Sequence, residues 1–321
     1  MNGLKKTSNL IKTTFSYVCS SAIHRPLTWG LPSFFSVEPL NLCNLHCPEC
    51  PSGSGGLKRD RGMMSLRDYR RIIDQISPYA LHLTLYFQGE PLLHPSFPDF
   101  IRYAREKGLY TATSTNGQLL DETKAAELVE AGLDHLIVSV DGATQRTYEK
   151  YRTGGKLQLA LDGIRHIVEA RDRRSVRHPV VEMQTLVFAH NENELSEIRR
   201  MGKQLNIDRF TLKTAQIYDY RHGSPLMPVS RSHSRYVRQD DGTYRLKRGL
   251  PNRCRRMFCG AVIDWQGNVL PCAFDKDAEH RFGNLLQEDL RTIWYGARAQ
   301  AFRRRILTHR TSCAMCCNCV Y

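Results

Sequence analysis

Residues 43–50 read Cys43-Asn44-Leu45-His46-Cys47-Pro48-Glu49-Cys50, which places three cysteines in C-x-x-x-C-x-x-C order. A four-iron, four-sulfur cluster usually takes one cysteine per iron, so three close thiolates would leave the fourth iron free for a small molecule. Closely spaced cysteines also suit a zinc knuckle. The triplet alone therefore favours an iron-sulfur cluster and leaves zinc open.

The composition predicts a globular chain with metal centres. It has 321 residues, of which 41% are hydrophobic, enough for one large domain and a smaller one. No apolar stretch approaches the roughly 18–20 residues of a membrane span, so none is expected. The eleven cysteines cluster at 43–50, 254–272 and 313–319, with Cys19 alone. Clustered thiols without a secretory signal predict metal binding in the cytoplasm.

The first residues are predicted to form an amphipathic helix. Leu4, Ile11, Phe15 and Val18 recur at helical spacing, with Lys5, Lys6 and Lys12 on other faces. Polar interruptions argue against a signal peptide. Such a helix most often caps a core with its apolar face, and its rarer use is to lie on a membrane.

The net charge of +14 is unevenly spread. Between Arg221 and Arg256 there are ten Lys or Arg residues against Asp240 and Asp241. A solvated surface is the ordinary explanation. The alternative is a basic rim that attracts an acidic substrate, a nucleotide or a redox partner.

From Phe35 to Lys213, short β-rich runs alternate with helical patterns, which indicates parallel βα units. The expected strands are Ser36–Pro39, His82–Tyr86, Tyr110–Thr115, His135–Val140, Val180–Val187 and Arg209–Lys213. The expected helices are Leu66–Ile76, Phe97–Lys107, Glu122–Glu130, Leu157–Ala170 and Glu194–Leu205. Six units predict an α/β fold in which a partial (β/α)6 TIM-like barrel gathers its loops at the C-terminal strand ends.

Polar motifs follow these strands. The triplet lies in the loop 44–62 after the first strand, and Gln88-Gly89-Glu90-Pro91 follows the second. Gly89 would let backbone approach a ligand, and Glu90 could accept a charge-assisted hydrogen bond from an ammonium group. Asn116-Gly117 and Asp141-Gly142 follow the third and fourth strands, where both could also be plain turns.

The triplet followed by Gln88-Gly89-Glu90-Pro91 resembles the radical SAM superfamily. That resemblance implies S-adenosylmethionine at the open iron of a [4Fe-4S] cluster held by Cys43, Cys47 and Cys50. It implies cofactor contacts from Gly89, Glu90, Asn116, Ser139, Asp141 and Arg152. Gln184 is either a further contact or a core amide. Two positions depart from the family pattern: Glu49 replaces an aromatic residue, and Gln88 replaces the first glycine of G-G-E-P.

The later cysteines form a second set. Cys254 and Cys272 flank a probable hairpin that turns at Gly267, and the C-x12-G-x4-C run resembles the start of a SPASM-type domain. The tail holds overlapping C-x-x-C pairs that spacing alone does not separate. The resemblance implies one auxiliary [4Fe-4S] cluster on Cys254, Cys272, Cys316 and Cys319, with Cys313 or Cys259 as substitutes. A closed zinc site stays open as an alternative.

The expected organisation is a helical segment (1–34), the partial barrel (35–215), a basic linker (216–253) and the auxiliary-cluster domain (254–321). About 35 residues precede the barrel, too few for a leader-peptide-binding domain, and the tail is too short for a second auxiliary cluster. A catalytic acid, base or radical relay is not predicted.

The resemblance implies reductive cleavage of S-adenosylmethionine to a 5'-deoxyadenosyl radical, which abstracts hydrogen from a peptide or protein. The alternative substrate is a small anionic metabolite or a nucleotide. The expected reductant is a flavodoxin or a ferredoxin, and nucleic acid is not an expected partner. A non-enzymatic, zinc-bearing binding module is a third interpretation.

Overall fold

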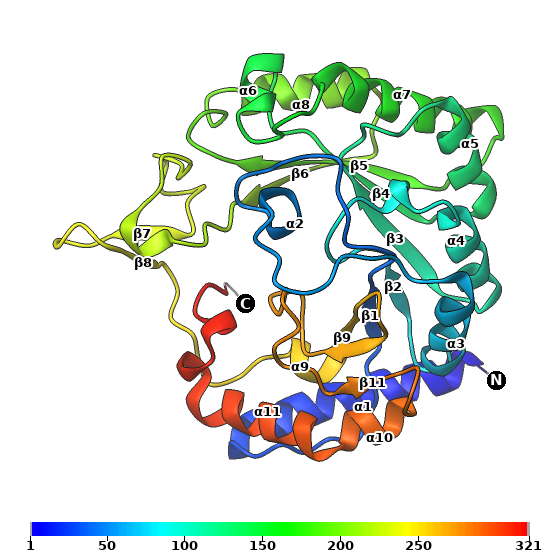
Figure 1. Cartoon of the computed structure of the whole chain (residues 1–321), viewed down its shortest axis with the longest axis vertical. Coiled ribbons are helices and arrows are strands. Elements are labelled where there is room, and N and C mark those ends of the chain that lie inside the picture. Colours follow the sequence, from blue (N-terminus) through cyan, green and yellow to red (C-terminus); the bar gives the residue numbers. More distant parts are fainter. Residues whose placement is uncertain (1, 320–321) are drawn as a thin grey trace.

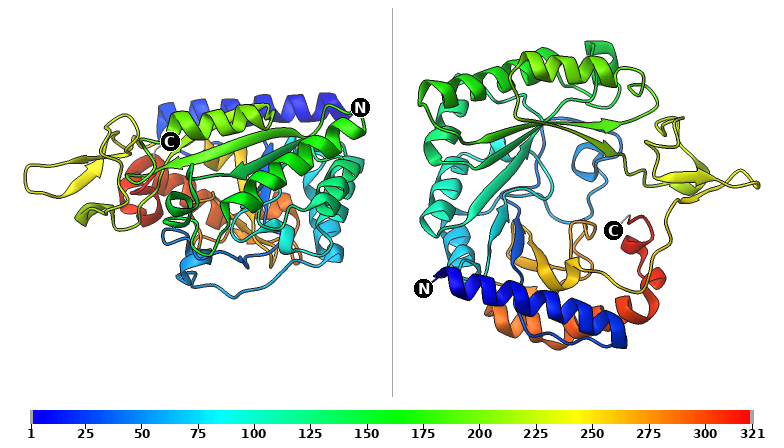
Figure 2. Two further views of the ribbon diagram at one scale, coloured as in Figure 1. Left: turned by 90° about the horizontal axis from the view of Figure 1, so that it is seen from above. Right: turned by 180° about the vertical axis from the view of Figure 1, so that it is seen from behind.

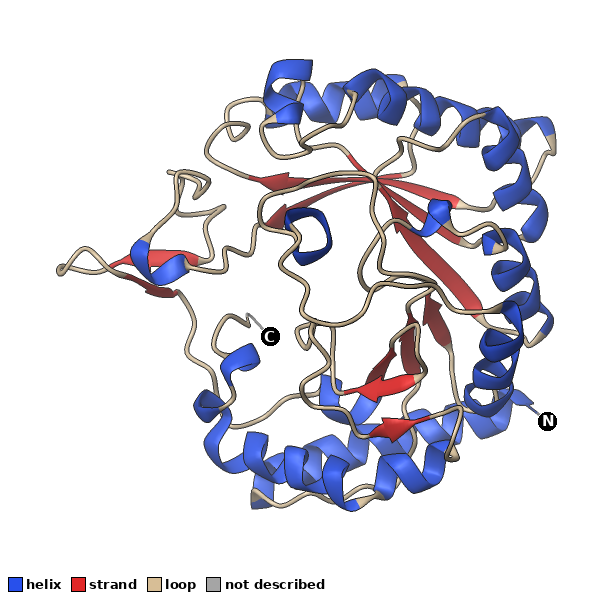
Figure 3. Ribbon diagram, in the orientation of Figure 1, coloured by secondary structure: helices blue, strands red, loops and turns tan. Residues whose placement is uncertain are grey.

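The computed structural model describes residues 2–319, which build one curved sheet with helices outside it (Figures 1 and 3). The strands of the main sheet are β1 (Phe34–Val37), β2 (His82–Thr84), β3 (Tyr110–Thr115), β4 (His135–Ser139), β5 (Val180–Val187), β6 (Arg209–Thr214), β9 (Gly260–Ile263), β10 (Asn268–Leu270) and β11 (Gly283–Asn284). Their order is β11-β10-β9-β1-β2-β3-β4-β5-β6. The sheet is an open barrel, because β6 and β11 stand at its two ends.

Most helices cover the outer surface of this sheet (Figure 1). The helices are α1 (Asn2–Ile23), α2 (Pro51–Ser54), α3 (Leu66–Ile76), α4 (Phe97–Glu106), α5 (Glu122–Ala131), α6 (Gln145–Glu149), α7 (Leu157–Arg173), α8 (Leu195–Gln204), α9 (Arg256–Cys259), α10 (Leu290–Tyr295) and α11 (Ala297–His309). Helix α2 is an exception, because it lies inside the ring that the strands and outer helices form in Figure 1. A two-stranded arm, β7 (Tyr236–Arg238) and β8 (Tyr244–Leu246), stands away from the barrel beside β6.

The predicted α/β partial barrel is confirmed. Strands β1 to β6 pair in parallel in chain order, as six βα units require. The first strand lies at Phe34–Val37 rather than Ser36–Pro39, and the second ends at Thr84 rather than Tyr86. The fifth strand, Val180–Val187, has the expected bounds. The carboxyl ends of these strands therefore share one rim of the barrel.

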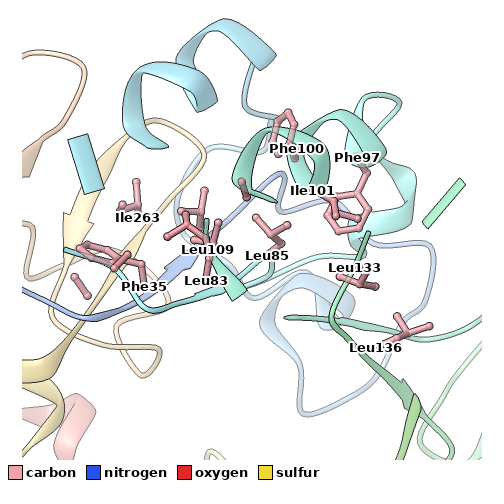
Figure 4. Packing of buried hydrophobic residues seen from close by; sticks show 14 of the residues in the cluster. Phe35, Leu83, Leu85, Phe97, Phe100, Ile101, Leu109, Leu133, Leu136 and Ile263 are labelled. Carbon is pink, nitrogen blue, oxygen red and sulfur yellow. The ribbon is translucent and has the colours of Figure 1, made fainter. Parts of the chain in front are cut away.

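The helices are held on the sheet by their apolar faces. Helix α3 begins at Ser65, whose hydroxyl accepts a hydrogen bond from Asp68 N, and buries Tyr69, Ile72, Ile73 and Ile76. The ring of Tyr69 stacks on Phe100 of α4 with centroids 3.9 Å apart. Figure 4 shows Phe100 with Leu83 and Leu85 in this core. Each such buried side chain contributes roughly 1.5–3 kcal/mol to the free energy of unfolding.

The C-terminal hairpin joins the barrel sheet. Strand β9 pairs in parallel with β1, with Phe34 opposite Gly260 and Val37 opposite Ile263, and β10 returns antiparallel to β9. The expected turn at Gly267 has a φ of +87°, which suits glycine. Pairing between β1 and β9 joins segments far apart in the chain, so local patterns did not predict it.

The expected helix at the start of the chain is present as α1, but its apolar face does not cap the core. The apolar residues Leu4, Ile11, Phe15 and Val18 are exposed, whereas the opposite face is buried. That buried face is polar and consists of Lys6, Asn9, Thr13, Ser16 and Ser20. Its side chains bond to backbone at 27–31 and at Gly108, so hydrogen bonds rather than apolar burial set the orientation. Within residues 2–319, no helix is long and apolar enough to cross a bilayer.

Candidate active site

The three early cysteines meet at the rim formed by the carboxyl ends of the strands. Cys43, Cys47 and Cys50 lie on the loop between β1 and α2, and Cys50 N donates to Cys47 O at 3.1 Å. They line a cavity of about 340 Å³ together with residues from the ends of β2, β3 and β4. Of the expected contacts, these include Gly89, Glu90, Asn116, Ser139 and Arg152.

The loop after β2 supports the cysteine loop. Gly89 has a φ of +79°, and a Cβ there would lie 2.6 Å from Leu42 O, so only glycine fits against this backbone. Glu90 is buried and donates its own N–H to Leu42 O. Its carboxylate accepts from Thr115 Oγ1 at 2.7 Å and from Asn116 N at 2.8 Å. Glu90 thus fixes the loops after β2 and β3 relative to each other.

Asn116 connects the third strand to the cysteines. Its Nδ2 donates to Asn44 Oδ1 at 2.8 Å, and its Oδ1 accepts from Gln118 N at 3.0 Å. Asn44 directly follows Cys43 in the chain. Asn116 therefore holds the start of the cysteine loop while also lining the cavity.

Asp141 and Gln184 do not line this cavity, unlike Arg152. Asp141 is fully buried, and its carboxylate accepts from Arg152 Nε at 2.6 Å and from Leu186 N at 2.7 Å. The Asp141 carboxylate thereby orients the guanidinium of Arg152 from behind. Gln184 lies within β5, opposite Ser139 of β4 in the register.

Burial raises the pKa of two of the three cysteine thiols. It raises the pKa of Cys43 to about 11, and it also raises the pKa of Cys47, although the Arg152 guanidinium opposes that rise. Without a metal, both thiols hold their protons at neutral pH. A bound metal ion must therefore displace these protons.

Residues from other segments cover the cavity, and sequence reasoning did not identify them. Glu49, which departs from the family pattern, accepts a hydrogen bond from Tyr218 N at 2.9 Å. The Lys276 ammonium lies 4.7 Å from the centroid of the Tyr218 ring, and both Lys276 and Arg235 line the cavity. Two sequence signals bear on these residues: the acidic residue at position 49 and the basic stretch from Arg221 to Arg256, which contains Arg235.

The C-terminal segment also braces the cysteine loop. Arg59 of that loop forms a buried ion pair with Glu38, and its Nε donates to Lys276 O at 2.7 Å. Lys58 N donates to Asp277 Oδ1 at 2.8 Å, and Trp265 Nε1 donates to Asp60 O at 3.2 Å. The loop is therefore held by Glu38 after β1 and by residues 265–277 of the C-terminal segment.

The later cysteines meet in a second pocket. Its lining includes all four favoured cysteines, Cys254, Cys272, Cys316 and Cys319. Most of its other walls are apolar, from Met257, Pro271, Phe274, Phe302, Ile306 and Met315. Two N–H groups point at its sulfurs, since Phe274 N lies 3.4 Å from Cys272 Sγ and Arg310 Nη2 lies 3.4 Å from Cys319 Sγ. Burial raises the pKa of Cys272 to about 12.

The remaining late cysteines lie outside this pocket. Cys259 is buried and lines an inner cavity of about 790 Å³, which borders the pocket at Cys254 and Cys272. Cys313 is buried 3.6 Å from His280 Nε2, and the Cys317 thiol donates to Thr311 O. The pocket lining favours Cys254, Cys272, Cys316 and Cys319, although Cys313 shares a hydrogen bond with Cys316.

Both cysteine sets fit iron-sulfur clusters. Within residues 2–319, no three His, Cys, Asp or Glu side chains converge as they would around one metal ion. Each set instead lines the walls of a shared cavity, which suits a cluster of several iron and sulfide ions better than a single zinc ion. The soft thiolate donors and the N–H groups near sulfur agree with this chemistry.

The sequence is similar to those of several curated proteins. A relative from Pyrococcus furiosus, described as a tungsten-containing aldehyde ferredoxin oxidoreductase cofactor-modifying protein, is 25% identical over 84% of this chain and 83% of its own. The PqqA peptide cyclase of Rhodopseudomonas palustris is 27% identical over 63% of this chain, and the match spans about half (52%) of that relative.

Solved structures share the fold. The SuiB protein of Streptococcus suis bound to S-adenosylmethionine has a TM-score of 0.66 and 16% identity, with 94% of this chain and 75% of that chain covered. BtrN in complex with AdoMet and 2-DOIA has a TM-score of 0.57 and 21% identity, with 92% and 95% covered.

Two family models match. The radical SAM superfamily covers residues 37–202, and the iron-sulfur cluster-binding SPASM domain covers residues 254–320. The chain therefore belongs to the radical SAM superfamily, as an enzyme that uses a [4Fe-4S] cluster and S-adenosylmethionine and carries an iron-sulfur SPASM domain at its C-terminal end.

Proposed function

We propose that this enzyme modifies a peptide or protein by abstracting a hydrogen atom from a side chain. When bound, the [4Fe-4S] cluster and S-adenosylmethionine supply the electron and the 5'-deoxyadenosyl radical for that abstraction. One observation carries the peptide assignment: the cavity at the cysteine loop reaches Thr214 and Gln216, at the end of edge strand β6. An extended peptide can pair with such an edge and place a side chain in the cavity.

Cys43, Cys47 and Cys50 are proposed to hold the cluster that binds S-adenosylmethionine. Asn116, Ser139 and Arg152 would contact that cofactor from the cavity wall, where the Arg152 guanidinium suits a carboxylate. Gly89, Glu90 and Asp141 would position the loops and the Arg152 side chain around the cofactor, because their contacts are to the chain itself. Tyr218 and Lys276 would restrict water at the open side.

One auxiliary cluster is proposed on Cys254, Cys272, Cys316 and Cys319. Their shared pocket supports this set over one that includes Cys259 or Cys313. Four thiolates would leave that cluster without a free iron, which suits electron transfer rather than substrate binding. The proposed electron donor to the enzyme is a flavodoxin or a ferredoxin.

Isotope transfer tests the peptide proposal. Peptides encoded beside the gene would be made with deuterated side chains and incubated anaerobically with the loaded enzyme, S-adenosylmethionine and dithionite. We expect deuterium in the 5'-deoxyadenosine product, measured by mass spectrometry. Label that transfers only from a deuterated metabolite extract, and never from these peptides, would overturn the peptide assignment.

A small anionic substrate is the second candidate. The inner cavity of about 790 Å³ is lined by Arg253, Arg255 and Arg256 beside Cys254 and Cys272. That volume suits a small molecule, and guanidinium groups bind carboxylates and phosphates. If the substrate is anionic, Arg253→Gln with Arg255→Gln should raise its KM and flatten its salt dependence. A peptide that pairs with β6 should be much less affected.

A further inference from the structure

The outer face of α1 is an exposed apolar stripe, which we define as Leu4, Ile11, Phe15 and Val18. Their exposed fractions are 82%, 53%, 58% and 53%. At 3.6 residues per turn these positions fall on one side of the helix. A helix on the surface of a globular protein normally turns that side towards the core. The stripe therefore requires an explanation outside the fold of this chain.

Hydrogen bonds on the opposite face hold the stripe outward. Asn9 Nδ2 donates to Leu31 O at 2.8 Å, and Asn9 Oδ1 accepts from Leu31 N at 2.9 Å. Ser16 Oγ accepts from Trp29 N at 2.9 Å, and Lys6 Nζ donates to Gly108 O at 2.9 Å. A rotation that buried the stripe would break these buried bonds, so its exposure is built into the fold.

The charge around the stripe identifies what covers it. The sequence has no Asp or Glu before Glu38. Lys5 and Lys12 are exposed beside the stripe, and the Lys5 ammonium lies 4.8 Å from the centroid of the Tyr79 ring. Two copies packed through this face would bring the same lysines together without an acid from this segment to pair them. An anionic surface is the complementary partner.

The pattern of the helix agrees with such a partner. An apolar stripe with lysines along its edge is the pattern of a helix that lies in the plane of a membrane surface.

We propose that the outer face of α1 binds the surface of an anionic lipid bilayer. The stripe would enter the boundary between headgroups and acyl chains, while Lys5 and Lys12 contact the headgroups. Figure 2 shows α1 and the cysteine loop with α2 on opposite faces of the barrel. Membrane binding would therefore leave the proposed substrate opening towards water.

Vesicle binding of the full chain tests this proposal. The probes are vesicles of phosphatidylcholine alone and of equal parts phosphatidylcholine and phosphatidylglycerol, separated by flotation. We expect about tenfold or stronger binding to the anionic vesicles, lost at high salt. The double variant Ile11→Gln, Phe15→Gln should weaken binding by about tenfold or more. Lys5→Gln with Lys12→Gln should remove the preference for anionic lipid.

Leu159→Gln is the matched control, because Leu159 of α7 is 43% exposed but lies away from α1. It should bind vesicles like the unchanged protein. All variants should keep the same melting temperature and the same rate of S-adenosylmethionine cleavage. Equal vesicle binding by the Ile11, Phe15 variant would overturn the proposal. The proposal would also be overturned if the protein did not bind vesicles and instead formed a dimer that the Ile11, Phe15 variant dissociates.

Discussion

The two cysteine regions use the same residue type in opposite surroundings. Cys43, Cys47 and Cys50 come from one short loop and face a cavity of about 340 Å³ whose walls mix polar and apolar side chains. The later set comes from distant segments and faces a pocket with largely apolar walls. The comparison teaches that the number of proposed thiolate ligands decides whether an iron can be left free, and that the surroundings decide whether a ligand could reach it.

The two regions are also connected. Tyr86 lines both the cavity at the cysteine loop and the inner cavity of about 790 Å³. Cys254 and Cys272 line that inner cavity from its far side. A substrate in the inner cavity would thus lie between the two proposed clusters, which suits removal of an electron from a substrate radical.

The largest effect is expected from a change in the cysteine loop, at Cys43, Cys47 or Cys50. Cys47→Ser should abolish S-adenosylmethionine cleavage, because it removes one of only three proposed ligands. 5'-Deoxyadenosine formed with dithionite measures this, and iron content should fall. Cys19→Ser is the control, since Cys19 lies on α1, away from both sets. Cleavage at the normal rate by the Cys47 variant would refute the assigned ligand set.

A change in the later cysteine pocket should affect product formation without affecting S-adenosylmethionine cleavage. Cys272→Ser should lose substrate conversion while S-adenosylmethionine cleavage persists, because only the auxiliary cluster loses a ligand. Iron analysis and electron paramagnetic resonance should show one cluster retained. Cys317→Ser is the control, because Cys317 lies outside the pocket. If the Cys272 variant kept its loop cluster but lost S-adenosylmethionine cleavage as completely as the Cys47 variant, the two regions would not have separate roles.

A smaller effect is expected from Asp141, which orients Arg152. Asp141→Asn should lower kcat/KM for S-adenosylmethionine cleavage by about 100-fold, mainly through a higher KM, because misplaced positioning groups cost about that much. A merely structural role would lower the melting temperature without changing KM. Asp162→Asn is the control, since Asp162 pairs with Arg165 on the surface of α7. An unchanged KM would exclude the positioning role.

Sequence reasoning identified what local patterns encode. The βα alternation predicted the barrel, and parallel strand ends must share a rim, so Cys43, Glu90 and Asn116 were expected together. Interactions between distant segments could not be predicted. Strand β9 beside β1, and Lys276 over the cavity, depend on packing that no local period encodes.

Some polar residues that are predicted to contact the cofactor are also used by the fold itself. The carboxylates of Asp141 and Glu90 both bond to neighbouring loops, and Glu90 also lines the cavity. A carboxylate after a strand has the same sequence signal whether it meets a ligand or a backbone N–H. Helix α1 is a second example. Its apolar spacing predicted a helix, but the hydrogen bonds of Asn9 and Ser16 set which face is buried.

The smallest expected effect concerns the ionisation of the two regions. In the cluster-free protein, burial raises the pKa of Cys43 to about 11 and that of Cys272 to about 12. Thiolate is the reactive form, so Cys43 should react with iodoacetamide faster than Cys272. Both rates should rise with pH. Mass spectrometry of anaerobically labelled protein measures them, with Cys19 as the internal reference.

The same shifts predict the direction of a stability change. A folded pKa above the ordinary thiol value of 9.0 means that folding favours the protonated form. The free energy of unfolding of the cluster-free protein should therefore decrease as pH rises from about 9 towards 11. Cys272→Ala should reduce that decrease, whereas Cys19→Ala should leave it unchanged. Faster labelling of Cys272 than of Cys43 would mean that the closed pocket opens in the absence of its cluster, which would confine the contrast between the two regions to the loaded enzyme.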